Sequence, residues 1–152
     1  MTAAPESRAE TAGAIETRAI IMEREVAHAP EKVWRAITTS ALMEDWLMSN
    51  DFKPEVGHAF TLRTAPNGPW NGVTEGQVLE VEPPRRLVYT WNSTGGEGVE
   101  TVVTWTLSPT AKGALIRMEQ SGFRPDQTQN LQGAAYGWRR FMAGLEQTLD
   151  GL

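Results

Sequence analysis

Three polar side chains lie at positions where strand alternation directs them into an otherwise apolar interior. Tyr89, Thr101 and Gln120 each alternate with apolar residues on a separate strand-like segment. A polar group that is buried needs a hydrogen-bond partner. We expect these groups either to pair with the backbone and with each other, or to orient a hydroxyl or carbonyl oxygen of a bound molecule. The sequence favours neither alternative.

Large apolar residues are expected around these polar groups. The chain of 152 residues contains six tryptophans. Large aromatic side chains supply buried area in a small domain, and they also line ligand cavities. Core packing is the more frequent role for any single tryptophan, and both roles are compatible. The candidate ligand-binding residues are Trp46, Tyr89, Trp91, Thr101, Val103, Trp105, Met118, Gln120, Phe123 and Trp138.

Acid–base catalysis requires titratable groups inside the site, and two glutamates on predicted strands are the candidates. The alternation that directs Val99 and Thr101 inward turns Glu100 towards solvent. Glu75 has an ambiguous orientation, because the neighbouring Gly76 can mark a β-bulge. We expect both glutamates to be exposed.

Metal binding and nucleophilic catalysis find no support in the residue spacing. A metal site needs converging His, Cys or carboxylate ligands, but His28 and His58 lie in separate segments near loops and are expected at the surface. Ser121 has no base beside it. The glycine-rich segment 92–98 precedes a strand rather than a helix, so it indicates a hairpin loop and not a phosphate cradle. We assign no catalytic residue, no metal and no cofactor.

The elements that must position these residues are mainly strands. Turn-forming residues separate the strand-like segments, and the short connections favour an antiparallel meander. The predicted strands are Ile15–Val26, His58–Thr64, Gly72–Val81, Arg85–Trp91, Val99–Leu107 and Ala114–Gly122.

Helical patterns occur before and after the run of strands. Pro30–Thr38 predicts a short helix, and Ser40 is expected to cap a second one that contains Trp46. Leu131–Leu152 is the only long helical pattern. The order predicts an α+β fold with helices on one face of an antiparallel sheet. A long helix on a curved sheet tends to enclose a cavity. We expect the segment from Leu131 to Trp138 to face a ligand and the second half of the helix to form core.

Composition and charge restrict the class of protein. The chain lacks cysteine, which excludes disulfides and favours a cytoplasmic location. A net charge of −5 argues against nucleic acid or an anionic membrane surface as a partner. No apolar run approaches the roughly 18 residues that span a bilayer. Residues 1–13 are interpreted as a disordered leader, and residues 14–152 as a single domain.

Several segments resemble a known family when they are taken in their order and spacing. They are APEKVWRAIT, EDWLM, EVEPPRRLVYTW, VVTWTL, SGF and GWRRFMAGLEQTL. Together they resemble the SRPBCC, or START-related, superfamily, and most closely the group named after the activator of the heat-shock chaperone ATPase. The resemblance implies a helix-grip fold, in which a curved antiparallel six-stranded sheet wraps around a long C-terminal helix. It also implies two short helices between the first two strands, and a hydrophobic tunnel between the long helix and the sheet.

The resemblance carries over to particular residues. Trp46, Trp91 and Trp105 match tryptophans of the family. Gly122-Phe123 matches its SGF step before the last loop, and Gly137-Trp138 matches the pair early in its long helix. These positions imply packing and cavity wall rather than catalysis. Many relatives have HSGF where this chain has QSGF, so a neutral amide, that of Gln120, replaces an imidazole and weakens a proton-transfer role.

Three functions remain open. Binding of a small hydrophobic or aromatic ligand is favoured by the inward tryptophans and by the lack of an acid–base pair. A cyclase- or dehydratase-like enzyme acting on a hydrophobic substrate is the first alternative, because such enzymes need few catalytic residues. A chaperone-cofactor-like interaction module is the second, and it rests on fold-level analogy. A chaperone or a second copy of the chain is the corresponding protein partner.

Overall fold

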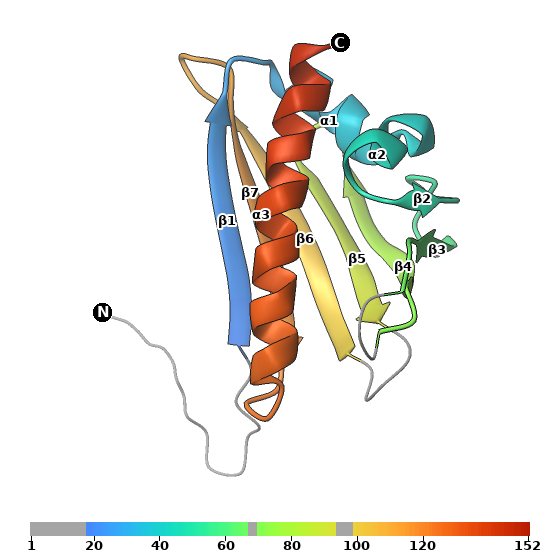
Figure 1. The fold of residues 1–152 in the computed structure, drawn as a ribbon. Coiled ribbons are helices and arrows are strands. Elements are labelled where there is room, and N and C mark those ends of the chain that lie inside the picture. Colours follow the sequence, from blue (N-terminus) through green and yellow to red (C-terminus); the bar gives the residue numbers. More distant parts are fainter. Residues whose placement is uncertain (1–17, 67–69, 94–98) are drawn as a thin grey trace.

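One long antiparallel sheet forms the frame of the molecule (Figure 1). The computed structural model describes residues 18–66, 70–93 and 99–152. Its strands are β1 (Arg18–Val26), β2 (Ser49–Asn50), β3 (Ala59–Arg63), β4 (Val73–Glu82), β5 (Arg86–Ser93), β6 (Val99–Pro109) and β7 (Ala114–Phe123). They lie in the order β1-β7-β6-β5-β4-β3-β2, and the sheet stays open. The expected leader, and residues 94–98 of the expected hairpin loop, lie outside the described residues.

The sheet has seven strands where the sequence predicted six. The additional strand, β2, contains two residues and pairs with β3. Two residues are too few to show an alternation of side chains, so the pattern could not reveal this strand. The amide of Asn50 holds the segment by donating hydrogen bonds to the carbonyl oxygens of Ser40 and Met48.

Two short helices, α1 (Pro30–Thr38) and α2 (Ser40–Trp46), follow β1 and cover one end of the sheet (Figure 1). Helix α1 begins at Pro30, as predicted, because proline tolerates the first turn where its missing N–H is not needed. The expected cap of α2 is wrong. Ser40 is the first helical residue, and its hydroxyl donates to the carbonyl oxygen of Asn50 instead.

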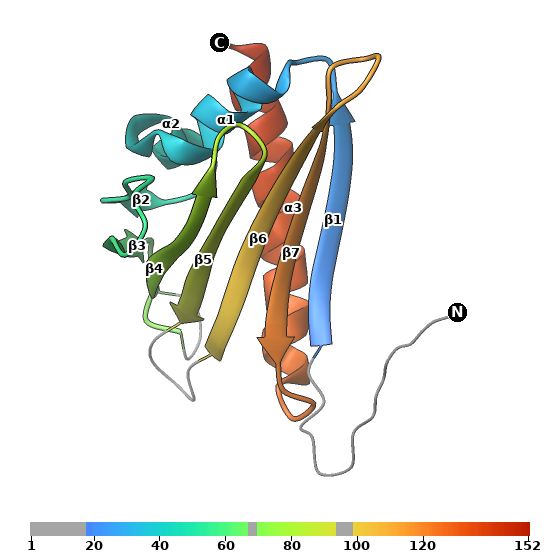
Figure 2. The ribbon, with the colours of Figure 1, turned by 180° about the vertical axis from the view of Figure 1, so that it is seen from behind.

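The long helix α3 (Thr128–Asp150) lies along the concave face of the sheet and ends beside α1 (Figure 1). It begins three residues before the expected start at Leu131. Its buried residues are Trp138, Met142, Leu145 and Leu149, whereas Leu131, Ala134 and Ala135 in its first half are only partly buried. The view from behind shows that no described helix covers the outer face of the sheet (Figure 2). No described helix combines the length and the apolar character needed to cross a membrane.

Strand alternation places the predicted inward residues on the face that α3 covers. Leu87, Tyr89 and Trp91 on β5 are buried, and the inward positions of β6 and β7 are buried in the same way. The register irregularity in β4 lies between Val78 and Glu80, not at Gly76. Gly76 instead allows a close approach: a Cβ there would lie 2.3 Å from the carbonyl oxygen of Thr90 and 2.4 Å from the ring of Phe60.

Candidate ligand site between helix α3 and the sheet

Trp138 of α3 occupies the centre of an aromatic cluster between the helix and the sheet. Its ring centroid lies 5.3 Å from that of Trp91 on β5 and 5.8 Å from that of Trp105 on β6. The ring of Phe141, one turn further along α3, lies 5.4 Å away. Centroid distances of about 4.5–7 Å are those of favourable aromatic pairs. The helix is therefore joined to the middle of the sheet through tryptophan side chains.

A chain of hydrogen bonds runs through the same interior. The Trp138 Nε1–H donates to Gln120 Oε1 at 2.7 Å, and the Gln120 Nε2–H donates to Thr101 Oγ1 at 2.8 Å. The Thr101 hydroxyl donates in turn to the backbone oxygen of Trp91 at 2.7 Å. Gln120 and Thr101 are buried, so these partners satisfy groups that would otherwise be costly to bury.

Tyr89 forms a second buried polar contact. The Trp105 Nε1–H donates to Tyr89 Oη at 2.9 Å. The rings of Phe52 and Phe60 lie 5.8 Å and 5.3 Å from the Tyr89 ring. This apolar burial raises the pKa of the Tyr89 phenol well above its usual value, and the hydrogen bond from Trp105 offsets only part of that rise. Tyr89 is therefore a neutral group over the physiological pH range.

The structure brings most of the predicted site residues into one region. Val103 lies opposite Gln120 and Met118 lies opposite Trp105, so the β6–β7 pair contributes a continuous inner surface. Trp46 contacts the Trp105 ring at 5.8 Å from α2. Phe123 is buried at the end of β7 that lies away from α1 and α2. Their contact with a ligand stays a prediction.

The aromatic side chains of this region are buried and in contact with one another. Two hollows of the described surface lie elsewhere. One is bordered by Glu25, His28 and Asp150, and the other by Asn50, Asp51 and Arg63. A molecule that enters between α3 and the sheet therefore has to displace side chains, and the tryptophans Trp91, Trp105 and Trp138 are the largest of those in contact.

The groups considered for acid–base catalysis lie away from this region. Glu75 and Glu100 are exposed, as predicted. His58 Nε2 is bonded to the backbone oxygen of Asp51 at 2.9 Å, an exposed contact. Within the part of the chain that the structure describes, no three His, Asp or Glu side chains come together as a metal-binding group.

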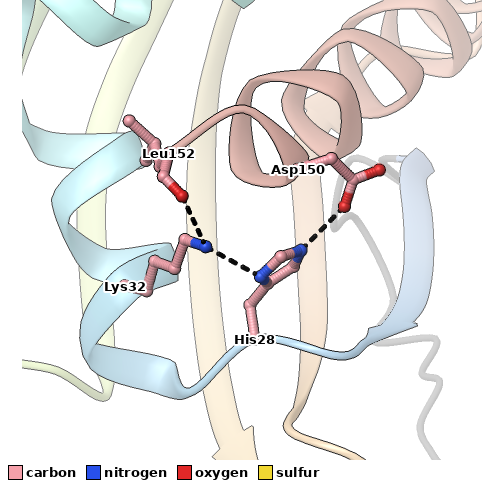
Figure 3. Close-up of polar contacts among 4 residues, drawn as sticks. All are labelled: His28, Lys32, Asp150 and Leu152. Carbon is pink, nitrogen blue, oxygen red and sulfur yellow. Dashed lines mark hydrogen bonds and ion pairs between the residues drawn. The ribbon is translucent and has the colours of Figure 1, made fainter.

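His28 has partners that sequence spacing did not reveal. Its Nε2 lies 2.8 Å from Asp150 Oδ1 and its Nδ1 lies 3.1 Å from Lys32 Nζ (Figure 3). Lys32 also donates to the backbone oxygen of Leu152 at 3.3 Å. Asp150 is 122 positions away in the chain, so only the packing of α3 against the β1–α1 segment brings the pair together. This cluster joins elements at the end of the sheet covered by α1, away from the aromatic cluster.

Thr74 is a buried polar residue that the sequence analysis did not identify. Its side chain is completely buried on β4, and its Oγ1 has no hydrogen-bond partner among the described residues. The uncertainty about a bulge at Gly76 concealed it, because the face of β4 could not be assigned. With the bulge placed after Val78, the alternation from Thr74 to Val78 is regular and would have revealed this residue.

Comparison with known proteins identifies the family. The family model of the activator of Hsp90 ATPase homolog 1-like proteins matches residues 27–150. The chain belongs to this family. The match confirms the resemblance seen in the sequence and extends over all the elements from α1 to α3. No curated protein matches the chain.

Solved structures of similar proteins support the assignment. The chain is 49% identical to protein MLL2253 from Mesorhizobium loti, with a TM-score of 0.81, and the match covers 88% of this chain and 97% of that one. It is 26% identical to BH1534 from Bacillus halodurans, with a TM-score of 0.72 and coverage of 87% and 96%. DynU16, a protein of the dynemicin biosynthetic locus, shares the fold at 21% identity and a TM-score of 0.70, with coverage of 88% and 47%. As a member of the activator of Hsp90 ATPase homolog 1-like family, the chain has an α+β architecture consistent with the helix-grip fold.

Proposed function

We propose that the protein binds a small aromatic or hydrophobic molecule between the first half of α3 and the sheet. The observation that carries the proposal is the cluster of Trp91, Trp105 and Trp138 rings around Gln120. Aromatic walls with a few placed polar groups are typical of ligand sites. The fold of the family and the location of DynU16 in a biosynthetic locus are compatible with this proposal.

Binding is coupled to the movement of Trp138 in this proposal. The indole ring shifts aside and becomes a wall against the ligand, and its N–H stays bonded to Gln120 Oε1. Gln120 keeps its second hydrogen bond, to Thr101. The partly buried residues Leu131, Ala134 and Ala135 lie in the half of α3 that has to give way. The site is therefore closed in the unliganded state and opens at the end of the sheet opposite α1 and α2.

The test compares Trp138→Ala with Leu145→Ala after a screen of hydrophobic compounds by thermal shift. A compound that binds raises the melting temperature of the native protein. We expect Trp138→Ala to weaken binding by at least tenfold and to lower stability as well. Leu145→Ala is the matched control, because Leu145 is fully buried in the second half of α3. We expect it to cost about 2–5 kcal/mol of stability and to leave the affinity unchanged.

Two results would contradict the proposal. One is a native protein whose melting temperature no compound in the library raises, together with native mass spectra that show no retained molecule. The other is a Trp138→Ala variant that loses stability alone, because Trp138 would then be an ordinary core residue.

The enzyme alternative gains no support from the contacts, since Glu75 and Glu100 are exposed and His58 is bonded to backbone. A chaperone-cofactor role follows only from the name of the family. The exposed large apolar side chains within the described residues include Ile21, Val56 and Tyr136, which lie on three different segments. A pull-down from native lysate tests that role directly.

A further inference from the structure

Thr74 is a buried polar side chain for which the described protein supplies no partner. It lies on the inner face of β4, opposite Leu62 on β3 and Ser93 on β5. Its exposed fraction is 0%, and its Oγ1 has no hydrogen bond with any of residues 18–66, 70–93 and 99–152. Leu62 is equally buried, which confirms that Thr74 points to the covered face.

Three other buried polar side chains have hydrogen-bond partners. Thr101 donates to the backbone oxygen of Trp91, and Thr38 donates to that of Trp34. Gln120 donates through its amide N–H to Thr101 and accepts at its amide oxygen from Trp138. A buried hydroxyl without a partner is destabilising relative to one that is satisfied. In the unliganded protein Thr74 therefore destabilises the fold at a position where valine has nearly the same shape.

The position of Thr74 relates it to the candidate site. It lies near the start of β4, at the end of the sheet opposite α1 and α2 (Figure 1). Its cross-strand partner, Ser93, is two residues from Trp91 on the same face of β5. Diagonal neighbours of this kind are about 7–8 Å apart, within reach of an aromatic side chain. The ring of Trp91 contacts that of Trp138 at 5.3 Å.

The charged neighbours of Thr74 restrict the chemistry of a partner. Arg63 on β3 and Glu75 on β4 are exposed, because alternation turns them to the outer face. A carboxylate or an ammonium group at Thr74 would have no counter-ion among the described residues beside it on β3 and β4, and it would be costly to bury. A neutral hydroxyl or carbonyl oxygen is the partner that suits an isolated threonine hydroxyl.

We propose that Thr74 is the polar anchor of the ligand site: its Oγ1 hydrogen-bonds a neutral hydroxyl or carbonyl oxygen of a planar aromatic ligand whose apolar body lies against Trp91 and Trp138. This inference rests on the proposed function and adds the class of ligand, an aromatic molecule with one neutral oxygen at the end that meets β4. The hydrogen bond between the ligand and Thr74 Oγ1 offsets part of the free-energy cost of displacing Trp138.

The experiment uses two probes of nearly equal shape, 2-naphthol and 2-methylnaphthalene. Their affinities are measured by the quenching of tryptophan fluorescence in the native protein and in Thr74→Val, Thr74→Ser and Thr104→Val. We expect the native protein to prefer 2-naphthol. Thr74→Val should lose about fivefold to tenfold in affinity for 2-naphthol, the equivalent of one hydrogen bond, and keep its affinity for 2-methylnaphthalene. Thr74→Ser should keep the preference.

Thr104→Val is the matched control, because it makes the same chemical change at a half-exposed position on the other face of β6. It should leave both affinities unchanged. Without ligand, Thr74→Val should melt at the same temperature as the native protein or higher, since the variant removes an unsatisfied hydroxyl.

The outcomes separate this inference from the proposed function. If the native protein binds both probes and Thr74→Val keeps the same preference, the role of Thr74 is overturned while the ligand site stands. If unliganded Thr74→Val melts several degrees lower, the hydroxyl has a partner within the protein and the inference is overturned. If neither probe binds to the native protein, the proposed function fails and the role of Thr74 fails with it.

Discussion

At the scale of a single residue, the burial of Tyr89 makes the stability of this fold depend on pH. An unperturbed tyrosine has a pKa of about 10, and burial raises the pKa of Tyr89 above that value in the folded protein. Above pH of about 10 the unfolded chain releases the phenolic proton while the folded chain keeps it. The unfolded state then binds fewer protons, so the free energy of unfolding falls as pH rises. Below pH of about 10 the phenol is protonated in both states, and the full contribution of Tyr89 to stability is present.

We predict that Tyr89→Phe removes part of this alkaline loss of stability. At pH 7 the variant should be less stable by about 1–3 kcal/mol, because the Trp105 Nε1–H loses its partner. The difference from the native protein should narrow above pH of about 10. Urea unfolding at a series of pH values measures both effects. Tyr136→Phe is the control, since Tyr136 is exposed on α3. A constant difference between Tyr89→Phe and the native protein would contradict the prediction.

At the scale of the element, helix α3 is held differently along its length. Its second half has the buried residues Leu145 and Leu149, the ion pair Arg24–Glu146 at 3.3 Å and the hydrogen bond between His28 and Asp150 at 2.8 Å. Its first half contacts the rest of the protein mainly through Trp138 and through residues that are partly exposed. The half expected from the sequence to face a ligand is thus the half with fewer contacts.

We predict that His28→Ala loosens the second half of α3 and leaves the candidate site intact. The variant removes the contacts of the imidazole with Asp150 and Lys32 (Figure 3). The expected loss of stability is about 0.5–1.5 kcal/mol, as for the removal of a hydrogen bond near the surface. Chemical denaturation measures this loss, and hydrogen exchange locates it in residues 145–150.

His58→Ala is the control, because His58 is bonded only to the backbone oxygen of Asp51 among the described contacts of its ring. A His28→Ala variant with unchanged stability would show that the cluster is an incidental surface contact. A large loss of ligand affinity in the same variant would also contradict the separation between the two ends of the helix.

At the scale of the whole molecule, the α+β class, the long strands and the three helices follow from local patterns. Alternation identified the inward residues of β5, β6 and β7, and a helical period identified the buried stripe of α3. The sequence could not reveal partners that depend on tertiary packing, such as Asp150 for His28 or Gln120 for Trp138. The sequence also does not show whether side chains fill the interior, because this depends on side-chain conformations and not on residue spacing. Thr74 was missed because the position of one β-bulge determines which residues of β4 face inward.

The filled interior and the uneven anchoring of α3 lead to a prediction about the motion of the whole fold. Local opening is favoured where buried contacts are few, and glycine inside a helix costs roughly 0.5–1 kcal/mol relative to alanine. Gly133 and Gly137 both lie in the first half of α3, and a Cβ at Gly133 would meet nothing within 4 Å. No packing contact requires glycine at Gly133, so its effect there is to weaken the helix.

We therefore predict that amide hydrogens of residues 131–137 exchange faster than those of residues 142–149 in the unliganded protein. Saturating 2-naphthol should slow exchange in the first group and leave the second unchanged, because the ligand fixes only the half of α3 that opens. Gly133→Ala should slow exchange in the first group without ligand, by about twofold to fivefold for a stabilisation near 0.5–1 kcal/mol. Gly144→Ala is not equivalent, since a Cβ there would make an ordinary packing contact with Trp46 at 3.4 Å and would change more than the helix propensity. Uniform exchange along α3, or protection by ligand only in its second half, would contradict the prediction that the first half of α3 opens.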